Sequence, residues 1–367
     1  MSSNKKIRVG ITQGDTNGIG LEVVLKTLAT PEFTELCTPI VYSSNKIISY
    51  HRKANDLPYF QTNNIRYARD AREGNVNVLD LGGEEVKIEL GEPSKQAGQA
   101  AFRSLEAAVS DLKNGQIDVL VTAPINKDNI QSEQFTFPGH TEYLEASLGD
   151  GGHALMTLCN PLLRVALVTN HMPIAKVPAA ITTELVGERL RTFNASLQRD
   201  FGVERPRIAV LSLNPHAGEN GLLGSEEEAV IKPAIDAAYD ERILAFGPYA
   251  ADGFFGSGHY RQFDGVLAMY HDQGLASFKA LAMNEGVNFT AGLPFVRTSP
   301  DHGTGYDIAG KNMANETSLR QAIYVAIDVY RNRKKYDEAH VNPLRKQYFE
   351  RGKDNVVLDL TKDENDE

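Results

Sequence analysis

Three of the nine histidines follow apolar, strand-like segments at a similar short distance. They are His171 after residues 163–169, His216 after residues 207–213 and His271 after residues 265–269. Ligands of open α/β sheets bind beyond the carboxyl ends of the strands, so aligned strands would bring the three imidazoles to one edge. Three histidines can hold a catalytic cation such as Zn, Co, Ni or Fe with one position open, whereas Mg prefers oxygen ligands. The alternative is that each histidine only hydrogen-bonds a neighbouring loop.

A second group of polar residues is suited to an anion. Lys279 lies on an expected helix, Asn288 in the next strand and Arg297 just beyond it. Arginine offers a planar two-pronged donor and lysine a point charge, and both suit phosphate or carboxylate. His140 and Thr141 stand at the start of another helix-like stretch, where they either hold an anion or cap the helix. A solvated lysine and a structural arginine are the alternative for Lys279 and Arg297.

The glycine-rich segments exclude two common nucleotide sites. Residues 14–20 lie between a strand and a helix, but no G-x-G-x-x-G occurs there or elsewhere. Residues 305–311 resemble a phosphate loop, yet Asn312 stands where serine or threonine would bind magnesium. A nicotinamide cofactor would therefore need a site other than a Rossmann fold.

Short β-rich runs alternate with helical patterns along the chain, which predicts an α/β protein with a mostly parallel sheet. The expected strands are Ile7–Thr12, Pro39–Tyr42, Val119–Thr122, Ala154–Cys159, Leu163–Thr169, Arg207–Leu213, Gly265–Met269 and Val287–Thr290. The expected helices are Ile19–Leu28, Lys95–Lys113, Thr183–Asp200, Glu226–Ala238, Gln273–Met283 and Ser318–Arg333. Ser225 and Glu228 form the pattern of a capping box at the start of the fourth helix.

The composition is that of a globular protein, and it argues against nucleic-acid-binding, membrane-spanning and disulfide-rich proteins. The 367 residues carry a formal charge of −10, and five acids and one lysine fall in 359–367, an expected disordered acidic tail. This charge gives no basic footprint for nucleic acid, and no apolar run is long enough to cross a membrane. Two cysteines are too few for a disulfide framework, and the chain has no signal-peptide pattern, so a cytoplasmic location is expected.

Several sequence blocks, taken together, resemble the 4-hydroxythreonine-4-phosphate dehydrogenase family of pyridoxal phosphate (vitamin B6) biosynthesis. In chain order they are G-D at 14–15 with G-I-G-x-E at 18–22, T-A-P-I-N-K at 122–127, F-P-G-H-T-E at 137–142, N-H at 170–171, N-P-H-A-G-E at 214–219, G-P at 247–248 with A-D at 251–252, Y-H-D-Q-G at 270–274 and R-T-S-x-D-H-G-T at 297–304. Residues 303–311 also resemble the cofactor loop of isocitrate and isopropylmalate dehydrogenases. The family pattern departs at Thr16, Asn17 and Leu21, which leaves the shape of the pocket open.

The resemblance implies an isocitrate/isopropylmalate dehydrogenase-like two-domain fold, with mostly parallel sheets flanked by helices and an active-site cleft between the domains. Residues 1–125 with 290–367 would form the outer domain on the cofactor side, and 126–289 the central domain for metal, substrate and dimerisation. The implied enzyme is a homodimer with the active site shared across the interface. It would oxidise 4-phosphooxy-L-threonine with NAD, or NADP as an alternative, and decarboxylate it to 3-amino-2-oxopropyl phosphate.

The resemblance also implies a role for particular residues. His171, His216 and His271 would bind a divalent metal, zinc in preference to cobalt or magnesium. His140, Thr141, Lys279, Asn288 and Arg297 would bind the phosphorylated hydroxy acid, and Gly303, Thr304 and Asp307 the cofactor. The proton acceptor stays open among Lys127, Asp252 and Asp272, each of which could instead hydrogen-bond a metal-binding histidine.

Three other functions remain open at this stage. The substrate could be a phosphorylated four-carbon sugar acid, D-threonate or D-erythronate 4-phosphate, because sister enzymes of the family act on such acids. A phosphate acyltransferase has a related architecture but gives the three histidines no task. A non-catalytic binding protein would leave the full set of ligand-type residues without a purpose.

Overall fold

One sheet of 12 strands runs through the molecule in the order β3-β4-β2-β1-β5-β12-β11-β6-β7-β10-β8-β9. The structure is a computed structural model that describes residues 5–82, 87–149, 153–282 and 284–342. The strands are β1 Arg8–Thr12, β2 Thr38–Ser43, β3 Thr62–Ile65, β4 Val76–Asp80, β5 Val119–Val121, β6 Leu155–Cys159, β7 Arg164–Leu167, β8 Arg207–Leu211, β9 Leu244–Tyr249, β10 Gly265–Ala268, β11 Val287–Ala291 and β12 Arg297–Pro300. The helices are α1 Gly20–Leu28, α2 Glu32–Leu36, α3 Asn45–Ala54, α4 Lys95–Lys113, α5 His140–Leu148, α6 Val177–Ala180, α7 Thr183–Arg199, α8 Lys232–Asp240, α9 Ala251–Gly256, α10 His271–Ala282 and α11 Thr317–His340.

The predicted α/β class is confirmed, with one important addition at the centre of the sheet. Most neighbouring strands are parallel, but β11 is antiparallel to β12 and to β6, and β6 is antiparallel to β7. The strands on the two sides of this centre therefore run in opposite directions. The sequence pattern of a single strand does not predict this reversal, because the relative direction of two strands depends on how they pair.

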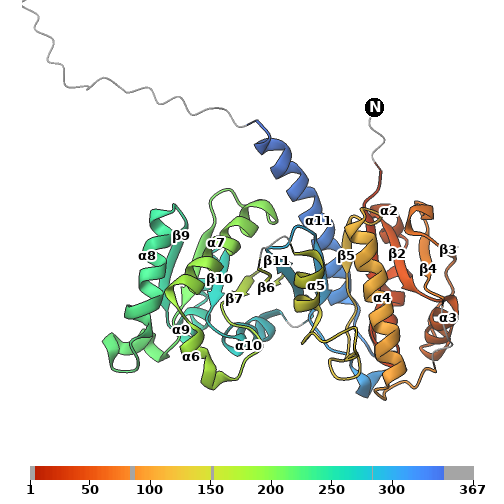
Figure 1. Ribbon diagram of the computed structural model, residues 1–367, viewed down its shortest axis with the longest axis horizontal. Coiled ribbons are helices and arrows are strands. Elements are labelled where there is room, and N and C mark those ends of the chain that lie inside the picture. The colour runs from red at the N-terminus through yellow and green to blue at the C-terminus, as the bar shows by residue number, and fades with distance from the viewer. Residues whose placement is uncertain (1–4, 83–86, 150–152, 283, 343–367) are drawn as a thin grey trace, which may run out of the picture.

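Figure 1 shows the elements in two groups on either side of the antiparallel centre. The N-terminal elements, in red and orange, lie on one side, and the green elements from α6 to β9 lie on the other, with β6, β11, α5 and α11 between them. This arrangement resembles the predicted pairing of the chain ends against a central segment, whose boundaries stay a prediction. The expected tail at 359–367 lies outside the described residues.

The regular elements follow from local sequence and burial. All six residues of β2 are buried, as expected for a parallel strand covered on both faces. Helix α4 begins at a hydroxyl cap, where Ser94 accepts a hydrogen bond from the N–H of Ala97, and places alanines and leucines on its buried side. No helix in the described part of the chain is long and apolar enough to span a membrane.

Two of the differences from the sequence expectation concern the start of a helix and a central strand. The predicted start of the fourth helix is confirmed, since Glu226 is its first helical residue and the carbonyl of Ser225 accepts from the N–H of Ala229 (2.8 Å). The predicted side-chain pairing differs: the carboxylate of Glu228 contacts Lys232 Nζ (3.2 Å), and the first turn is π-helical over Glu227–Ile231. The strand β12 was not predicted, because its sequence R-T-S-P is polar, although all four residues are buried. Its position is set by pairing with β5 and β11 rather than by hydrophobic alternation.

Candidate active site

A cavity of about 230 Å³ lies on one face of the central strands β6, β11 and β12. Arg297 and Ser299 are two positions apart on β12, so their side chains emerge on the same face. Asn288 of β11 pairs with Ser299, and Met156 of β6 completes this floor. The antiparallel centre of the sheet thus supplies the floor of the pocket.

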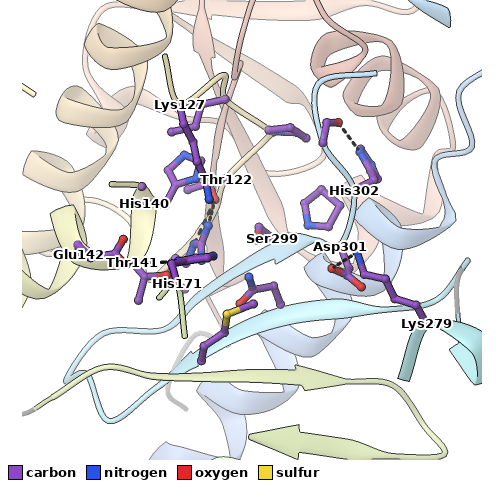
Figure 2. Close-up of a pocket in the computed structure, with 18 residues that line it drawn as sticks. Thr122, Lys127, His140, Thr141, Glu142, His171, Lys279, Ser299, Asp301 and His302 are labelled. Carbon is purple, nitrogen blue, oxygen red and sulfur yellow. Dashed lines mark hydrogen bonds and ion pairs between the residues drawn. The ribbon is translucent and has the colours of Figure 1, made fainter. Parts of the chain in front are cut away.

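The walls of the pocket come from segments that are far apart in the sequence. Figure 2 shows Lys127, His140, Thr141, Glu142 and His171 on one side and Lys279, Asp301 and His302 on the other. The first group belongs to the loop after β5, the first turn of α5 and the loop after β7. The second group belongs to α10 and the loop after β12. All five residues of the predicted anion set, His140, Thr141, Lys279, Asn288 and Arg297, line this one cavity.

Arg297 is a buried cation at the base of the pocket, with only 2% of its surface exposed. Its guanidinium donates to the hydroxyl of Thr122 from Nε (3.1 Å) and Nη2 (2.6 Å), and to that of Thr290 from Nη1 (3.2 Å). Loss of solvent lowers the pKa of Arg297 to about 10. Within the described residues it forms no ion pair, although the charge of Glu142 opposes the lowering of its pKa, and a buried charge that is not directly paired costs several kcal/mol. The site is therefore chemically prepared for an anion.

His140 stands beside this cation in its neutral form. Burial, followed by the charges of Arg297 and Lys127, lowers the pKa of His140 well below its usual value. Its Nε2 is buried and has no hydrogen-bond partner. A neutral imidazole can donate one hydrogen bond to an anion without adding a third charge.

Glu142 faces the first of the three predicted metal-binding histidines. Its Oε1 lies 3.7 Å from Nδ1 of His171, and the nearby imidazole lowers the pKa of Glu142. The other oxygen, Oε2, is buried without a partner. A carboxylate beside Nδ1 leaves Nε2 of the same ring free for a cation, which is the usual arrangement around a metal-binding histidine.

On the opposite wall, Lys279 and Asp301 form an ion pair across 3.4 Å. Burial raises the pKa of Asp301, and the Lys279 ammonium opposes this effect. His302 follows with Nδ1 against the carbonyl of Gly303 at 3.0 Å, and burial lowers the pKa of His302. Asp301 Oδ2, His302 Nε2 and Asn288 Oδ1 are all buried and unpartnered. A polar ligand would satisfy these atoms.

The three histidines follow three adjacent strands, as the sequence pattern suggested. The strands β7, β10 and β8 are neighbours and parallel, so His171, His271 and His216 lie along one edge. The rings of His171 and His271 are 5.6 Å apart between centroids. Within the part of one chain that the structure describes, no three His, Cys, Asp or Glu side chains form a metal-holding group. His216 lies outside the lining of the pocket.

The three candidates for proton transfer occupy different places. Lys127 lines the pocket, whereas Asp272 lines a neighbouring cavity with His171 and His271. Asp272 Oδ1 is 2.7 Å from His271 Nδ1, a contact that orients the ring. Asp252 is exposed in the first turn of α9, outside both cavities.

The predicted cofactor residues lie on the loop that leaves the pocket. Gly303 lines the cavity, and Asp307 is exposed farther along the same loop. The carbonyl of Thr304 accepts a hydrogen bond from the N–H of Ile19 (2.9 Å), and a Cβ on Gly18 would lie 2.5 Å from that oxygen. This close approach explains why glycine stands at position 18.

The carboxylate of Asp15 joins three loops around the pocket. Its Oδ2 accepts from Asn129 Nδ2 (2.7 Å) and from the hydroxyl of Tyr306 (2.9 Å), and its Oδ1 accepts from the N–H of Asn17 (2.8 Å). Burial and the Asp15 charge raise the pKa of Tyr306, which therefore stays protonated and donates. Asp15 thus links the segments that carry Lys127 and Gly303.

The three departures from the family pattern are packing residues outside the lining of this cavity. Asn17 donates to the carbonyl of Glu92 (2.7 Å) and accepts from the N–H of Glu89 (3.0 Å). Thr16 and Leu21 are fully buried. These three residues therefore pack beneath the loops of the site and do not form the wall of the cavity.

Sequence reasoning missed several pocket residues, among them Thr122, Glu142, Ser299, Asp301 and His302. All five belong to the sequence blocks quoted above, but their types alone gave no reason to separate them from their neighbours. The available signal was polarity within a buried strand end, as at Thr122 and Ser299. Glu142 could have been included because it directly follows Thr141 in the same predicted helix start.

Comparisons with known proteins agree with this architecture and site. Residues 35–326 match the family model "Pyridoxal phosphate biosynthetic protein PdxA". The chain is 57% identical to a 4-hydroxythreonine-4-phosphate dehydrogenase of Bacteroides thetaiotaomicron, covering 97% of both proteins. It is 38% identical to a relative from Oceanobacillus iheyensis, named for D-threonate 4-phosphate, over 89% of this chain and 98% of that protein.

A solved structure extends the likeness to three dimensions. The crystal structure of 4-hydroxythreonine-4-phosphate dehydrogenase from Klebsiella pneumoniae superposes with a TM-score of 0.77 at 33% identity, covering 90% of this chain and 99% of that one. The fold and the activity class expected from the sequence are confirmed, and the acyltransferase alternative is set aside. The chain belongs to the PdxA family of oxidoreductases in pyridoxal phosphate biosynthesis.

Proposed function

We propose that this chain oxidises 4-phosphooxy-L-threonine with NAD and a divalent metal, and that the product loses carbon dioxide to give 3-amino-2-oxopropyl phosphate. The observation that carries the proposal is the buried Arg297 without an ion-pair partner, at the base of a cavity that also contains Lys127, Lys279 and His140. A dianionic phosphate and a carboxylate would offset these charges. The names of the related proteins supply the substrate.

The residues present fit a divalent cation. His271 Nδ1 is held by Asp272 at 2.7 Å and His171 Nδ1 lies beside Glu142, so both rings can present Nε2 to a shared ion. All-imidazole ligation favours zinc or cobalt, whereas magnesium, the remaining alternative, prefers oxygen ligands. Bound there with His216 as the third ligand, such a cation would supply Lewis acidity toward the substrate hydroxyl and the product enolate.

The side chains of the pocket bind, orient and deprotonate the substrate. Arg297, Lys279 and Asn288 anchor its charged oxygens and fix the carbinol hydrogen, which NAD bound along residues 303–307 would accept as hydride. Lys127 lines the cavity and is the candidate within reach of the substrate hydroxyl proton. Asp272 acts by orienting His271 rather than by accepting a proton.

The proposed enzyme is a homodimer whose site is completed by both subunits. His216, in the turn after β8, and Asp252, in the first turn of α9 after β9, lie beyond the lining of the pocket. A second copy that presents these residues to the cavity would give each side chain a function. Both cysteines are free and buried, which suits a reducing compartment such as the cytoplasm.

A second substrate deserves a direct comparison. The relative from Oceanobacillus iheyensis is named for D-threonate 4-phosphate, which carries the same phosphate and carboxylate but a hydroxyl in place of the amine. NADH formation measured with both substrates, and with NAD and NADP, separates the alternatives. We expect a higher kcat/KM for 4-phosphooxy-L-threonine with NAD. A higher value for the sugar acid would reassign the substrate and leave the chemistry unchanged.

A further inference from the structure

One glutamine side chain joins the ends of two strands that carry the predicted metal-binding histidines. Gln273, in the first turn of α10, accepts a hydrogen bond from the N–H of Met269 at Oε1 (2.7 Å). Its Nε2 donates to the carbonyl of Ser212 at 2.6 Å. Met269 follows β10 and Ser212 follows β8, so the side-chain amide connects the ends of these two strands. Ser212 and Gln273 are 61 positions apart in the sequence.

The end of the third strand, β7, is hydrogen-bonded to the same residue, Met269. The hydroxyl of Thr169 donates to the carbonyl of Met269 (2.8 Å), and the N–H of Thr169 donates to the same oxygen (3.2 Å). Thr169 and Met269 each stand two residues before a histidine, His171 and His271. Thr169, Met269 and Ser212 are all buried, so these hydrogen bonds are shielded from water.

The connection continues from Ser212 to His216. Glu227, only 2% exposed, accepts at Oε1 from the N–H groups of Leu213 (2.8 Å) and Asn214 (2.7 Å). His216 then opens a run of residues with positive φ that includes three further non-glycine residues. Each such residue costs about 1–2 kcal/mol, so this left-handed turn requires firm anchors at its base.

Gln273 connects the two strands at a point beyond the end of their backbone hydrogen bonding. The ladder between β10 and β8 ends at the pair Leu267–Val210, before either histidine is reached. A glutamine amide has both the acceptor that Met269 N–H needs and the donor that the Ser212 carbonyl needs. Gly274 allows α10 to approach, because a Cβ there would lie 2.8 Å from Leu167 Cδ2.

We propose that Gln273 is a positioning residue that fixes the arrangement of the three histidine-bearing strand ends of one subunit, and hence how each imidazole is presented to a divalent cation, with His171 and His271 serving the pocket of their own subunit and His216 that of the partner subunit. The inference rests on the proposed metal role of His171, His216 and His271. It assigns Gln273 no contact with substrate or cofactor. Residues that orient metal ligands from behind typically change metal affinity by about 10–100-fold when they are replaced.

The test is the affinity of the metal-free full-length protein for Co²⁺, together with the visible absorption spectrum of the cobalt form. Gln273→Met keeps the length of the side chain and removes both hydrogen bonds. We expect its Co²⁺ affinity to fall by about 10–100-fold and its spectrum to change. Thr169→Val, which removes only one hydrogen bond to Met269, should lose several-fold and carries the test if Gln273→Met does not fold. Gln198→Met is the matched control, because Gln198 on α7 also donates to a backbone carbonyl, that of Glu204, but far from the histidines.

Two results would overturn the proposal, and they differ in meaning. If His171→Ala loses Co²⁺ while Gln273→Met and Thr169→Val bind it with unchanged affinity and spectrum, the positioning role is wrong and the metal assignment stands. If His171→Ala binds Co²⁺ as tightly as the parent chain, the metal assignment fails and the positioning role fails with it. A merely structural role would lower the melting temperature of Gln273→Met without altering the cobalt spectrum.

Discussion

The most informative single residue is Arg297, a guanidinium whose polar contacts are two threonine hydroxyls. Its lowered pKa, about 10, shows that the charge is held in surroundings that solvate it poorly. A bound anion reverses this penalty, since a charge-assisted hydrogen bond is about twice as strong as a neutral one. The proposed substrate would therefore gain much of its binding energy at this residue.

Replacing Arg297 with methionine should raise KM for the phosphorylated substrate by about 100-fold, since one partner of a buried ionic contact is removed. Steady-state kinetics of NADH formation provide the measurement. Arg191→Met is the matched control, because Arg191 forms an exposed ion pair with Glu241 and should leave KM unchanged. An equal rise for an unphosphorylated analogue would argue against phosphate as the partner of Arg297.

At the residue scale, sequence reasoning found the cations and missed the acids. Lys279, Asn288 and Arg297 were predicted because their types suit anions, and all three line the pocket. Glu142 and Asp301 were missed, because an acid becomes informative only when its neighbour is known. His171 is that neighbour for Glu142 and Lys279 is that neighbour for Asp301, and the fold brings each pair together from different elements.

At the scale of elements, the loop between β1 and α1 is supported by helix α3 through a buried histidine. His51 Nε2 lies 2.8 Å from the carbonyl of Thr16, and burial lowers the pKa of His51 to about 4. Between pH 6.5 and 4 the unfolded chain binds a proton that the folded chain does not. The free energy of unfolding therefore decreases as the pH falls through this range, by about 3 kcal/mol for this one group.

His51→Gln should make stability less dependent on acid, because glutamine can still donate to the Thr16 carbonyl but does not titrate. Urea unfolding at pH 7 and pH 4.5 measures the difference. His340→Gln, at an exposed position, should leave the pH dependence as it is in the parent chain. An unchanged acid sensitivity in His51→Gln would show that other groups account for it.

The loop after β12 depends on the hydrogen bond from Tyr306 to Asp15. Tyr306→Phe removes that donor while the ring remains, so the segment from Gly303 to Asp307 should be less well ordered. We expect KM for NAD to rise by about 3–10-fold, with Co²⁺ affinity unchanged, since a typical hydrogen bond contributes about 1 kcal/mol. Tyr50→Phe serves as an exposed control. A change in metal affinity instead would place the effect of Tyr306 at the histidines.

The elements themselves were predictable to different degrees. The strands that carry the histidines were found from apolar runs, because burial on both faces gives a strong signal. The pairing of β11 with β12 and β6 was not, because β12 is short and polar and the reversal arises from long-range pairing. These antiparallel strands form the floor of the pocket, so the position of the pocket could not be predicted from the sequence.

At the scale of the whole molecule, the described residues of one chain do not bring all the proposed site residues together. The predicted trio of histidines forms no metal-holding group within the described residues of a single subunit, and Asp252 lies outside the pocket. The proposed site shared by two subunits would account for both observations. This sharing is implied by the resemblance alone and stays a prediction, because apolar patterning does not distinguish an interface from a core.

Sharing predicts recovery of activity between two impaired variants, assayed at a substrate concentration near the KM of the parent chain. Co-expressed His216→Ala and Arg297→Met chains should form heterodimers with one intact site in two, and random pairing then restores roughly a quarter of the parent activity. Differently tagged chains allow the heterodimer to be isolated and assayed. Absence of activity in the isolated heterodimer would mean that His216 and Arg297 serve the site of the same subunit.

The central claim is that this pocket couples oxidation to loss of carbon dioxide with the help of a cation. The most direct measurement follows NADH and carbon dioxide together when the protein is given NAD and 4-phosphooxy-L-threonine, before and after a chelator is added. If the pocket works in this way, both products form in equal amounts, both are lost with the chelator, and both return with added zinc or cobalt. NADH formed at the full rate in the presence of chelator, or formed without carbon dioxide, would contradict it.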